Sequence, residues 1–185
     1  MTKIILGLVG PLASGKGTMK KYIVEKYSGE ECRFSTILRD ILNRVNVSIS
    51  RENLQNLSTI LRQNFGEDVL AKAITKDAQN FTADIVVVDG VRRMTDIAYL
   101  TEALNFYLVA VDAETKTRYE RLKMRNENAG DDQKTYEQFL SDQEAEAEKE
   151  IPLVMNRANF HIVNNGNLLA LYAQIDEIIS QVNTK

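Results

Sequence analysis

A chain of 185 residues is long enough to bury a core of its own as one domain, so no disulfide, metal or partner is needed to explain a stable fold. Hydrophobic residues make up 44% and charged residues 26%, and a net charge of −3 gives no electrostatic reason to expect a nucleic acid or an anionic membrane as partner. The single cysteine has no partner for an internal disulfide, and together with the single histidine it does not favour a zinc site.

The chain opens on an apolar run, "KIILGLVG" at residues 3–10, which is typical of a parallel strand buried on both faces. Apolar residues at helical spacing follow over residues 16–28, so a strand, a glycine loop and a helix begin an α/β domain. A secretory signal is the alternative, but Gly7, Gly10 and Pro11 interrupt the run. We therefore expect a cytoplasmic protein. No run of about 18 apolar residues occurs, so no membrane span is expected.

The remaining segments alternate between strand and helix patterns. Strands are predicted at 32–38, the weakest of them, and at 83–90, 104–112 and 158–166; helices are predicted at 38–46, 51–64, 67–79, 94–103, 114–126, 133–150 and 167–182. This alternation predicts a single α/β domain over residues 1–185, with a mostly parallel sheet and right-handed crossovers. Acidic residues dominate 131–150, which indicates a solvated helix face, with a flap over a site as the alternative.

A glycine pattern after the first strand has the spacing of a phosphate-binding loop. Gly10 is followed by four residues and then by Gly15-Lys16. The glycines let the backbone curl so that N–H groups point at phosphate oxygens, and the helix N-terminus adds partial positive charge. Lys16 supplies a point charge for the outer phosphates. Gly17 stands where the common pattern has Ser or Thr, and Thr18 comes one place later, which leaves open how a hydroxyl would reach magnesium.

The order "GKGT" in this loop resembles the nucleoside monophosphate kinases of the adenylate kinase group. The resemblance implies ATP as the phosphate donor, Mg²⁺ bound near Thr18 and Asp89, and a three-layer α/β/α P-loop NTPase fold with a five-stranded parallel sheet. It also implies a helical acceptor-binding insertion at 38–80 and a short lid at 126–135. The residues that it places around ATP in the loop are Gly10, Ala13, Ser14, Gly15, Lys16, Gly17 and Thr18.

The segment "VVVDGVRR" resembles the third strand of that family, which ends in Asp-Gly-aromatic-Pro-Arg. The resemblance makes Asp89 the carboxylate that organises magnesium and its waters, and Arg93 a ligand of the acceptor phosphate. The Asp-Gly-x-Arg spacing is closer to archaeal P-loop proteins related to dephospho-CoA kinase, which favours Arg92 as the anion ligand. A tight hairpin at Asp-Gly is the alternative. The loop and helix pattern of "RRMTDIAYL" disfavours it.

Further arginines lie in segments that resemble those of the family, in the same order along the chain. "STILRD" resembles the start of the acceptor-binding helices and implies that Arg39 contacts the acceptor phosphate, although Ser35-Thr36 replaces the family's Gly-Asp. In "TRYERLKMR", Arg121 and Arg125 lie four residues apart on one helical face, where they could bracket the transferring phosphoryl group. Salt bridges with nearby acidic residues are the alternative. The family's arginine after the lid has no counterpart here.

"NFHIVNNG" resembles the family's last strand and the loop that passes the donor base, so Asn164, Asn165 and Gly166 are expected to expose backbone groups there. His161 lies on this strand between apolar residues, which favours a structural role for it.

These residues lead to one main hypothesis, ATP-dependent phosphoryl transfer to a nucleoside or deoxynucleoside monophosphate, with Lys16, Asp89, Arg121 and Arg125 as the catalytic set. The first alternative is a small-metabolite kinase like dephospho-CoA kinase, whose hydroxyl acceptor could give its proton to Asp89 or Asp40. The second is an ATP-binding regulatory module with weak catalysis. We expect a small-molecule acceptor as partner, no nucleic acid or membrane, and a monomer or a homodimer.

Overall fold

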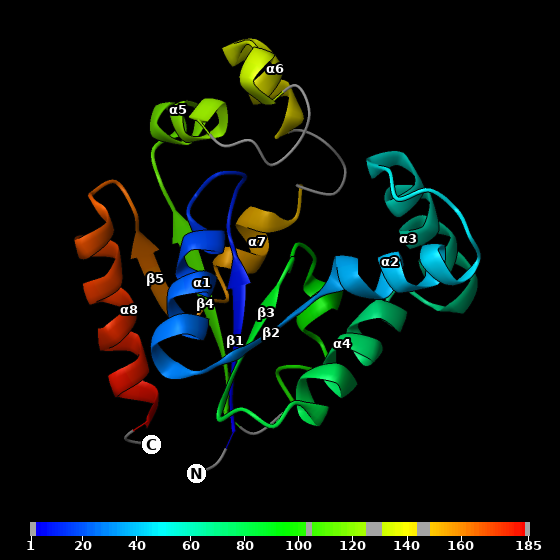
Figure 1. The fold of residues 1–185 in the computed structure, drawn as a ribbon, viewed down its shortest axis with the longest axis horizontal. Helices are drawn as coiled ribbons and strands as arrows, with labels where there is room; N and C mark the ends of the chain where they lie inside the picture. Colours follow the sequence, from blue (N-terminus) through cyan, green and yellow to red (C-terminus); the bar gives the residue numbers. More distant parts are fainter. Residues whose placement is uncertain (1–2, 103–104, 125–130, 144–148, 184–185) are drawn as a thin grey trace.

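Five parallel strands form one sheet in the computed structural model, which describes residues 3–102, 105–124, 131–143 and 149–183 (Figure 1). The strand order is β2-β3-β1-β4-β5, and each neighbouring pair is parallel. The carboxyl ends of all these strands therefore lie at the same edge of the sheet. The strands are β1 (Ile4–Val9), β2 (Glu30–Arg33), β3 (Ile85–Asp89), β4 (Phe106–Asp112) and β5 (Phe160–Val163).

Helices cover both faces of the sheet, because the central strands are apolar on both sides. In β1, Ile5 and Val9 contribute to one buried cluster, while Leu6 and Leu8 contribute to the other. The expected three-layer α/β/α fold with a five-stranded parallel sheet is confirmed. The cluster around Leu6 includes α1 (Lys16–Tyr27) and α8 (Leu168–Asn183); the cluster around Ile5 includes α2 (Phe34–Arg44), α4 (Val69–Asn80) and α7 (Ile151–Met155).

The remaining helices stand at the carboxyl edge and beside it. Between β2 and β3 the chain forms α2, α3 and α4, which extend to one side of the sheet, while α5 and α6 lie beyond its carboxyl edge (Figure 1). Ser50 begins α3, because its hydroxyl accepts a hydrogen bond from the N–H of Asn53. These elements are α3 (Arg51–Phe65), α5 (Thr115–Met124), α6 (Tyr136–Asp142) and the short 3-10 helices η1 (Met94–Ile97) and η2 (Asp131–Gln133).

The prediction for the second strand is wrong over most of its length. The strand covers Glu30–Arg33, and helix α2 already begins at Phe34. Phe34, Leu38 and Leu42 are buried at intervals of four residues, so they line one face of a helix. Phe34 and Leu38, which suggested a strand at 32–38, lie on the buried face of that helix.

Two predicted helices are also corrected. The segment 94–103 forms only a short 3-10 helix in its described part, because the Asp96 side chain binds backbone N–H groups that precede it. In place of one helix over 133–150, α6 ends at Asp142 and α7 begins at Ile151, while residues 144–148 lie outside the described part of the chain. The other predicted helices and strands are found within a few residues of their expected bounds.

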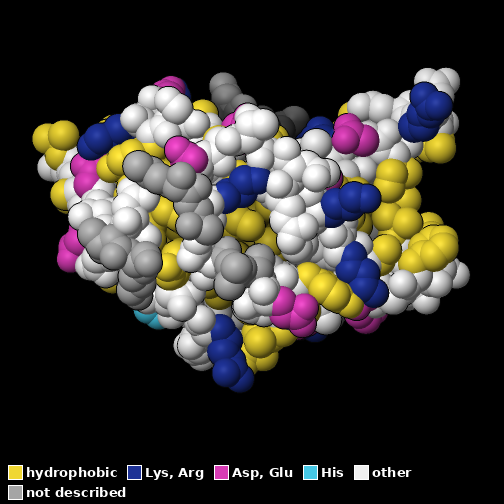
Figure 2. Space-filling model, turned by 90° about the horizontal axis from the view of Figure 1, so that it is seen from below, with side chains coloured by type: hydrophobic (Ala, Val, Ile, Leu, Met, Phe, Trp, Pro, Cys, Tyr) yellow, Lys and Arg dark blue, Asp and Glu magenta, His cyan; other side chains and the backbone are white. Residues whose placement is uncertain are grey.

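The insertion at 38–80 is helical as predicted, but its role in acceptor binding stays a prediction. Of the predicted lid at 126–135, residues 126–130 lie outside the described residues. In the described residues, no helix combines the length and the apolar character needed to cross a membrane. In Figure 2, basic and acidic side chains are interspersed, and hydrophobic side chains gather at the end where α3 lies, where Ile60 and Phe65 are exposed.

Candidate phosphate-binding site

The loop of residues 10–15 joins the carboxyl end of β1 to the N-terminus of α1. Gly10 has φ +154°, and a Cβ atom built there would lie 2.0 Å from the carbonyl oxygen of Val111 in β4. Gly15 has φ +112°, and a Cβ atom there would lie 2.1 Å from Asn164 Nδ2. Both glycines are therefore required by the close contact of the loop with β4 and with the residue that follows β5.

Lys16 is the first residue of α1. Its Nζ atom donates hydrogen bonds to the carbonyl oxygens of Gly10 (2.7 Å) and Pro11 (2.9 Å), so the ammonium group lies across the start of the loop. The hydroxyl oxygen of Ser14 is buried and has no hydrogen-bond partner among the described residues. An unpaired buried hydroxyl at the N-terminus of a helix fits a phosphate oxygen as its partner.

The other predicted loop residues occupy the same bend and the first turn of α1. Ala13 has φ +62°, the left-handed conformation. Gly17 is exposed, and a Cβ atom built on it meets no atom within 4 Å. Thr18 is half-buried one residue further along the helix. Space around residue 17 therefore does not explain why a glycine stands where the common pattern has a hydroxyl.

Asn164 braces the loop from the opposite end of the sequence. Its Nδ2 atom donates a hydrogen bond of 2.8 Å to the carbonyl oxygen of Ser14, and its own N–H donates to the carbonyl oxygen of Asp112 (2.7 Å). Only 5% of Asn164 is exposed. The sequence analysis expected only exposed backbone in this segment and missed this contact, since no local pattern pairs residues 150 positions apart.

Asp89 ends β3 at the same edge of the sheet and is held by two cations. Its Oδ2 atom lies 3.3 Å from Lys20 Nζ and 3.1 Å from Arg33 Nε, and Lys20 also lies 2.8 Å from Glu31 Oε2. The sequence analysis missed Lys20 and Arg33. A signal for Lys20 existed, because it follows Lys16 by four residues on the same helical face. Asp89 thus lies in a network of charges at the carboxyl edge.

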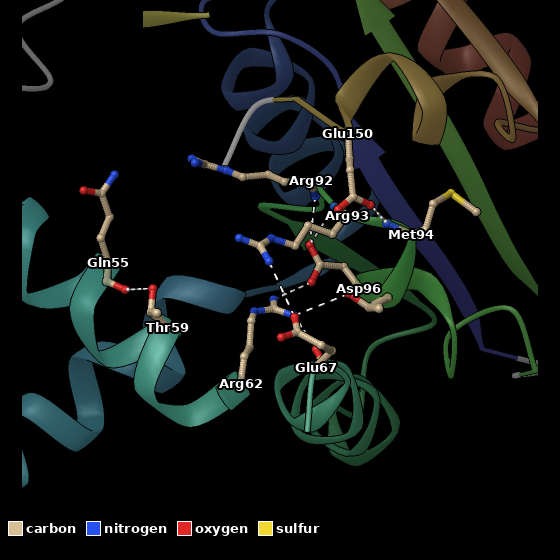
Figure 3. Close-up of polar contacts among 10 residues, drawn as sticks. Gln55, Thr59, Arg62, Glu67, Arg92, Arg93, Met94, Asp96 and Glu150 are labelled. Carbon is tan, nitrogen blue, oxygen red and sulfur yellow. Dashed lines mark hydrogen bonds and ion pairs between the residues drawn. The ribbon is translucent and has the colours of Figure 1, made fainter. Parts of the chain in front are cut away.

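The turn after β3 carries the two predicted acceptor ligands. The backbone N–H groups of Arg92 and Arg93 both donate to the same oxygen of Asp96. In Figure 3 the two arginine side chains leave the turn in the same direction, and Arg93 lies 3.6 Å from the carboxylate of Glu67. The structure thus places both arginines on one turn next to Asp89, as the sequence predicted. Their contact with an acceptor stays a prediction.

The other predicted arginines differ in their surroundings. Arg39 is exposed on α2, and its side chain forms no hydrogen bond or ion pair within the described part of the chain. Arg121 is half-buried on α5, and its Nη1 atom is buried without a hydrogen-bond partner in the described residues. Arg125 lies outside the described residues. Among the described residues, Arg121 thus has a donor that no protein group accepts.

Arg118 on α5 is part of the framework of the site. It is 5% exposed, and it donates from Nε to the carbonyl oxygen of Ala113 (2.9 Å) and from Nη2 to Gln143 Oε1 (2.8 Å). A longer bond of 3.4 Å reaches the carbonyl oxygen of Leu12 in the phosphate-binding loop. Burial lowers the pKa of this guanidinium from its ordinary value. Arg118 therefore connects the loop, α5 and the residue that follows α6.

A hollow of about 270 Å³ lies beside the loop, between the ends of β4 and β5. Asn165 lines it and is fixed to Glu114, because its Oδ1 atom accepts the N–H of Glu114 at 2.8 Å. Gly166 follows and is exposed, and His161 is exposed on β5. The lining residues are Asp112, Ala113, Glu114, Thr115, Arg118, Val163 and Asn165. The hollow lies where the sequence predicts the donor base.

The carboxylates near the loop offer few ligands for magnesium. In the described ranges of the chain, no group of three or more His, Cys, Asp or Glu side chains is placed to hold a metal ion. Asp89 offers one carboxylate, and its Oδ2 atom already contacts Lys20 and Arg33. These residues fit a magnesium ion that arrives with nucleotide phosphates, and they do not form a metal cage by themselves. Thr18 and Asp89 stay the predicted protein ligands.

Relatives of similar length cover nearly the whole chain. A UPF0200 protein of Thermococcus kodakarensis is 28% identical over 190 residues, which cover 100% of both chains. A UPF0200 protein of Methanococcus maripaludis is 25% identical over 180 residues, which cover 96% of this chain and 97% of the relative. The chain is therefore similar to these proteins from end to end.

Solved structures share the fold at low sequence identity. A shikimate kinase from Bacteroides thetaiotaomicron matches with a TM-score of 0.61 and 12% identity, over 97% of this chain and 98% of that one. The protein TT1252 from Thermus thermophilus matches with a TM-score of 0.59 and 13% identity, over 98% of each chain. These likenesses confirm a P-loop kinase-like fold, while the specific resemblance to adenylate kinases or dephospho-CoA kinase stays a prediction. A family model described as "AAA domain" matches residues 9–139, and because this is more than half of the sequence, the chain belongs to that family.

Proposed function

We propose that this protein transfers a phosphoryl group from ATP to a small acceptor that already carries a phosphate, and that the acceptor is a nucleoside or deoxynucleoside monophosphate. The observation that carries the proposal is the loop of residues 10–15. Two glycines there permit a backbone curl that no side chain fits, Lys16 lies across the curl, and the buried hydroxyl of Ser14 has no hydrogen-bond partner in the part of the chain that the structure describes.

The donor and acceptor sites face the same edge of the sheet in this proposal. The loop holds the β- and γ-phosphates, and the hollow beside Asn165 takes the base of ATP. Arg92 and Arg93 stand at the end of β3, the neighbour of β1, and are assigned to the acceptor phosphate, with Arg39 on α2 as a further ligand. Arg121, whose Nη1 atom has no hydrogen-bond partner among the described residues, and Arg125 are assigned to the charge that develops on the transferring group.

Magnesium supplies charge neutralisation and orients the phosphate oxygens when it is bound with ATP. The side chains of the protein contribute by their positions around the phosphate groups. Lys16 exchanges its two carbonyl partners for phosphate oxygens, and Asp89 stays fixed between Lys20 and Arg33 at the edge of the acceptor site. An acceptor phosphate is already anionic, so no general base is needed.

A hydroxyl acceptor is the second candidate. Such an acceptor gains from a carboxylate that takes its proton. Asp89 is the carboxylate at the right edge of the sheet, with its Oδ2 atom engaged by Lys20 and Arg33, whereas Asp40 is exposed on α2. The arginines that follow Asp89 in the chain, Arg92 and Arg93, supply positive charge for an acceptor phosphate and favour the monophosphate.

The variant Lys16→Ala tests the proposal. The loss of the ammonium group should lower transfer from radiolabelled ATP to a panel of nucleoside and deoxynucleoside monophosphates by about 100-fold or more, because a preorganised cation at the transferring group is removed. Circular dichroism should show an unchanged fold.

Lys21→Ala is the matched control for this experiment. Lys21 lies on the same helix with a side chain that is 74% exposed, and its ion pair with Glu25 is 3.7 Å long. This variant should keep wild-type turnover. Retained transfer in Lys16→Ala, or equal loss in both variants, contradicts the assignment of the loop.

A further inference from the structure

The turn that carries Arg92 and Arg93 is held by one buried carboxylate. Asp96 is 2% exposed, and its Oδ2 atom accepts the backbone N–H groups of both arginines at 3.0 Å each (Figure 3). The N–H of Asp96 donates in return to the carbonyl oxygen of Arg93 (3.0 Å). Two N–H groups on one oxygen fix the backbone from which both arginine side chains extend.

The other oxygen of Asp96 connects the turn to α3. Arg62 on α3 is 7% exposed, and its Nη2 atom lies 2.6 Å from Asp96 Oδ1. Arg62 also donates from Nη1 to the carbonyl oxygen of Glu67, in the corner between α3 and α4. The side chain of Glu67 lies 3.6 Å from Arg93 Nη1. The α3–α4 corner and the arginine turn are therefore joined by side chains at two points.

Asp96 and Arg62 form an ion pair in which both side chains are buried. A buried ion pair is costly to break, since removal of one partner leaves the other charged and unpaired. Such a pair contributes a defined geometry as well as stability, because both oxygens of the carboxylate are used. Because Asp96 is almost fully buried, its side chain does not contact a ligand directly.

We propose that Asp96 is the positioning residue of the acceptor site. Through its Oδ2 atom it holds Arg92 and Arg93 in the arrangement that receives an acceptor phosphate, and through Arg62 it makes that arrangement depend on the place of α3. The inference rests on the proposed function, in which these two arginines bind the acceptor. It predicts that the acceptor helices and the arginine turn move together.

The test measures the binding of inorganic phosphate to the full-length protein saturated with a non-hydrolysable ATP analogue, by isothermal titration calorimetry, so that the β- and γ-phosphate positions of the loop are already filled. Asp96→Asn keeps the size of the side chain but removes the charge and one acceptor oxygen. We expect phosphate to bind about tenfold more weakly, because the arginines must then be ordered on binding, while the affinity for the ATP analogue changes less than about twofold. An Asp96→Asn variant that binds phosphate like the wild type overturns the inference, and so does equal loss of affinity for the ATP analogue.

A thermodynamic cycle separates positioning from general destabilisation. The double variant Arg92→Ala/Arg93→Ala should bind phosphate measurably more weakly, and adding Asp96→Asn to it should cause no further loss, since Asp96 acts through these arginines. An additional loss in the triple variant contradicts the inference. If the wild type with the ATP analogue bound takes up no phosphate, the proposed acceptor site itself is rejected, and the inference falls with it.

Two further variants guard against misfolding and unspecific effects. Arg62→Met/Asp96→Asn removes both charges of the buried pair, so no unpaired charge remains, and it should regain stability without regaining phosphate affinity. Recovery of both would show that Asp96 acts only through stability and would overturn the inference. Tyr99→Phe is the matched control, because Tyr99 bonds Asp68 (2.6 Å) at the same corner of the fold. It should bind phosphate like the wild type.

Discussion

At the scale of single residues, the three glycines of the loop have different physical reasons. Gly10 and Gly15 have positive φ and face atoms at 2.0 and 2.1 Å from an added Cβ, so a side chain would displace the loop. Gly17 faces open space inside the first turn of α1. Gly10 and Gly15 are thus needed for the shape of the loop, whereas the backbone does not require a glycine at position 17.

Alanine substitution should separate these roles. Gly17→Ala should raise the free energy of unfolding by up to about 1 kcal/mol, because glycine is a poor helix former and the added methyl group meets nothing. Gly15→Ala should lower it by about 1 kcal/mol or more, because alanine at φ +112° is strained and would collide with Asn164. Urea denaturation followed by circular dichroism measures both values. Equal effects of the two substitutions would contradict this account of the loop.

Sequence reasoning succeeded for residues whose role is set by neighbours in the chain. Lys16 and Asp89 were found because their spacing relative to a strand end places them at the carboxyl edge. Asn164, Lys20 and Asp96 were missed as side chains that hold the site together. Asn164 acts on Ser14 across 150 positions, and Asp96 pairs with Arg62 across 34, so their roles depend on packing that no local pattern encodes.

At the scale of elements, α1 and α8 are joined by a cluster of side chains far from the loop. Asp176 on α8 accepts hydrogen bonds from Tyr27 (2.6 Å), Lys26 (2.7 Å) and Tyr22 (2.9 Å) on α1. Tyr22 also stacks on Tyr172, with ring centroids 3.9 Å apart. Burial opposes ionisation of Asp176, but the bonds from Lys26 and the tyrosines outweigh it and lower its pKa. The cluster holds together two helices that cover the same face of the sheet.

The cluster predicts how stability depends on pH. The folded pKa of Asp176 is lowered, so its contribution is present above the unfolded value of about 3.9 and is lost as the pH falls through the folded value. Hydrogen bonds to Asp176 and Tyr22 raise the pKa of Lys26, and burial raises the pKa of Tyr27 to about 12. Those contributions are present below the unfolded values of about 10.4 and 10 and are lost as the pH rises through the folded values.

Asp176→Asn tests this dependence. The wild type should be more stable than the variant near pH 7, and the difference should shrink below about pH 4 and above about pH 10. Urea unfolding at a series of pH values measures it. Glu177→Gln, on the same helix, is the control and should leave the pH profile unchanged, because Glu177 makes one bond of 3.3 Å to Gln181 on its own helix. A constant difference between wild type and Asp176→Asn would contradict the role of the cluster.

The elements themselves were predicted where one pattern dominates. The strands β1, β3 and β4 are apolar on both faces, and this continuous pattern identified them. The boundary between β2 and α2 was misplaced, because a four-residue edge strand runs directly into a helix with the same apolar letters. Local hydrophobicity cannot separate the two, since the difference lies in which neighbours the apolar side chains meet.

At the scale of the whole molecule, the candidate site lies between two sets of helices at one edge of the sheet. The insertion α2–α4 stands beside this edge, and α5 and α6 stand beyond it (Figure 1). Parallel strands and alternating helices were predicted, but the order β2-β3-β1-β4-β5 was not, because strand pairing depends on contacts distant in sequence. Arg62 connects the site to the first set, and Arg118 connects it to the second.

Arg118→Met should show that the attachment of α5 and α6 to the site depends on the buried guanidinium of Arg118. The substitution keeps the apolar stem but leaves the carbonyl oxygens of Leu12 and Ala113 and the amide of Gln143 without their donor. We expect a loss of about 1–3 kcal/mol in the free energy of unfolding, measured in urea, and weaker binding of ADP. Lys116→Met, at an exposed position of the same helix, should change neither quantity. Unchanged stability of Arg118→Met would contradict the framework role.

The two hydrogen bonds from Lys16 to its own loop have a consequence for ligand selection. An ammonium group has three N–H donors, so an anion that binds at Lys16 competes for them with two carbonyl oxygens, at 2.7 and 2.9 Å. A ligand that offers several charged oxygens at once competes better with the carbonyls than a single weak anion does. In the proposed function, this internal competition favours a polyphosphate over the small anions that surround every protein.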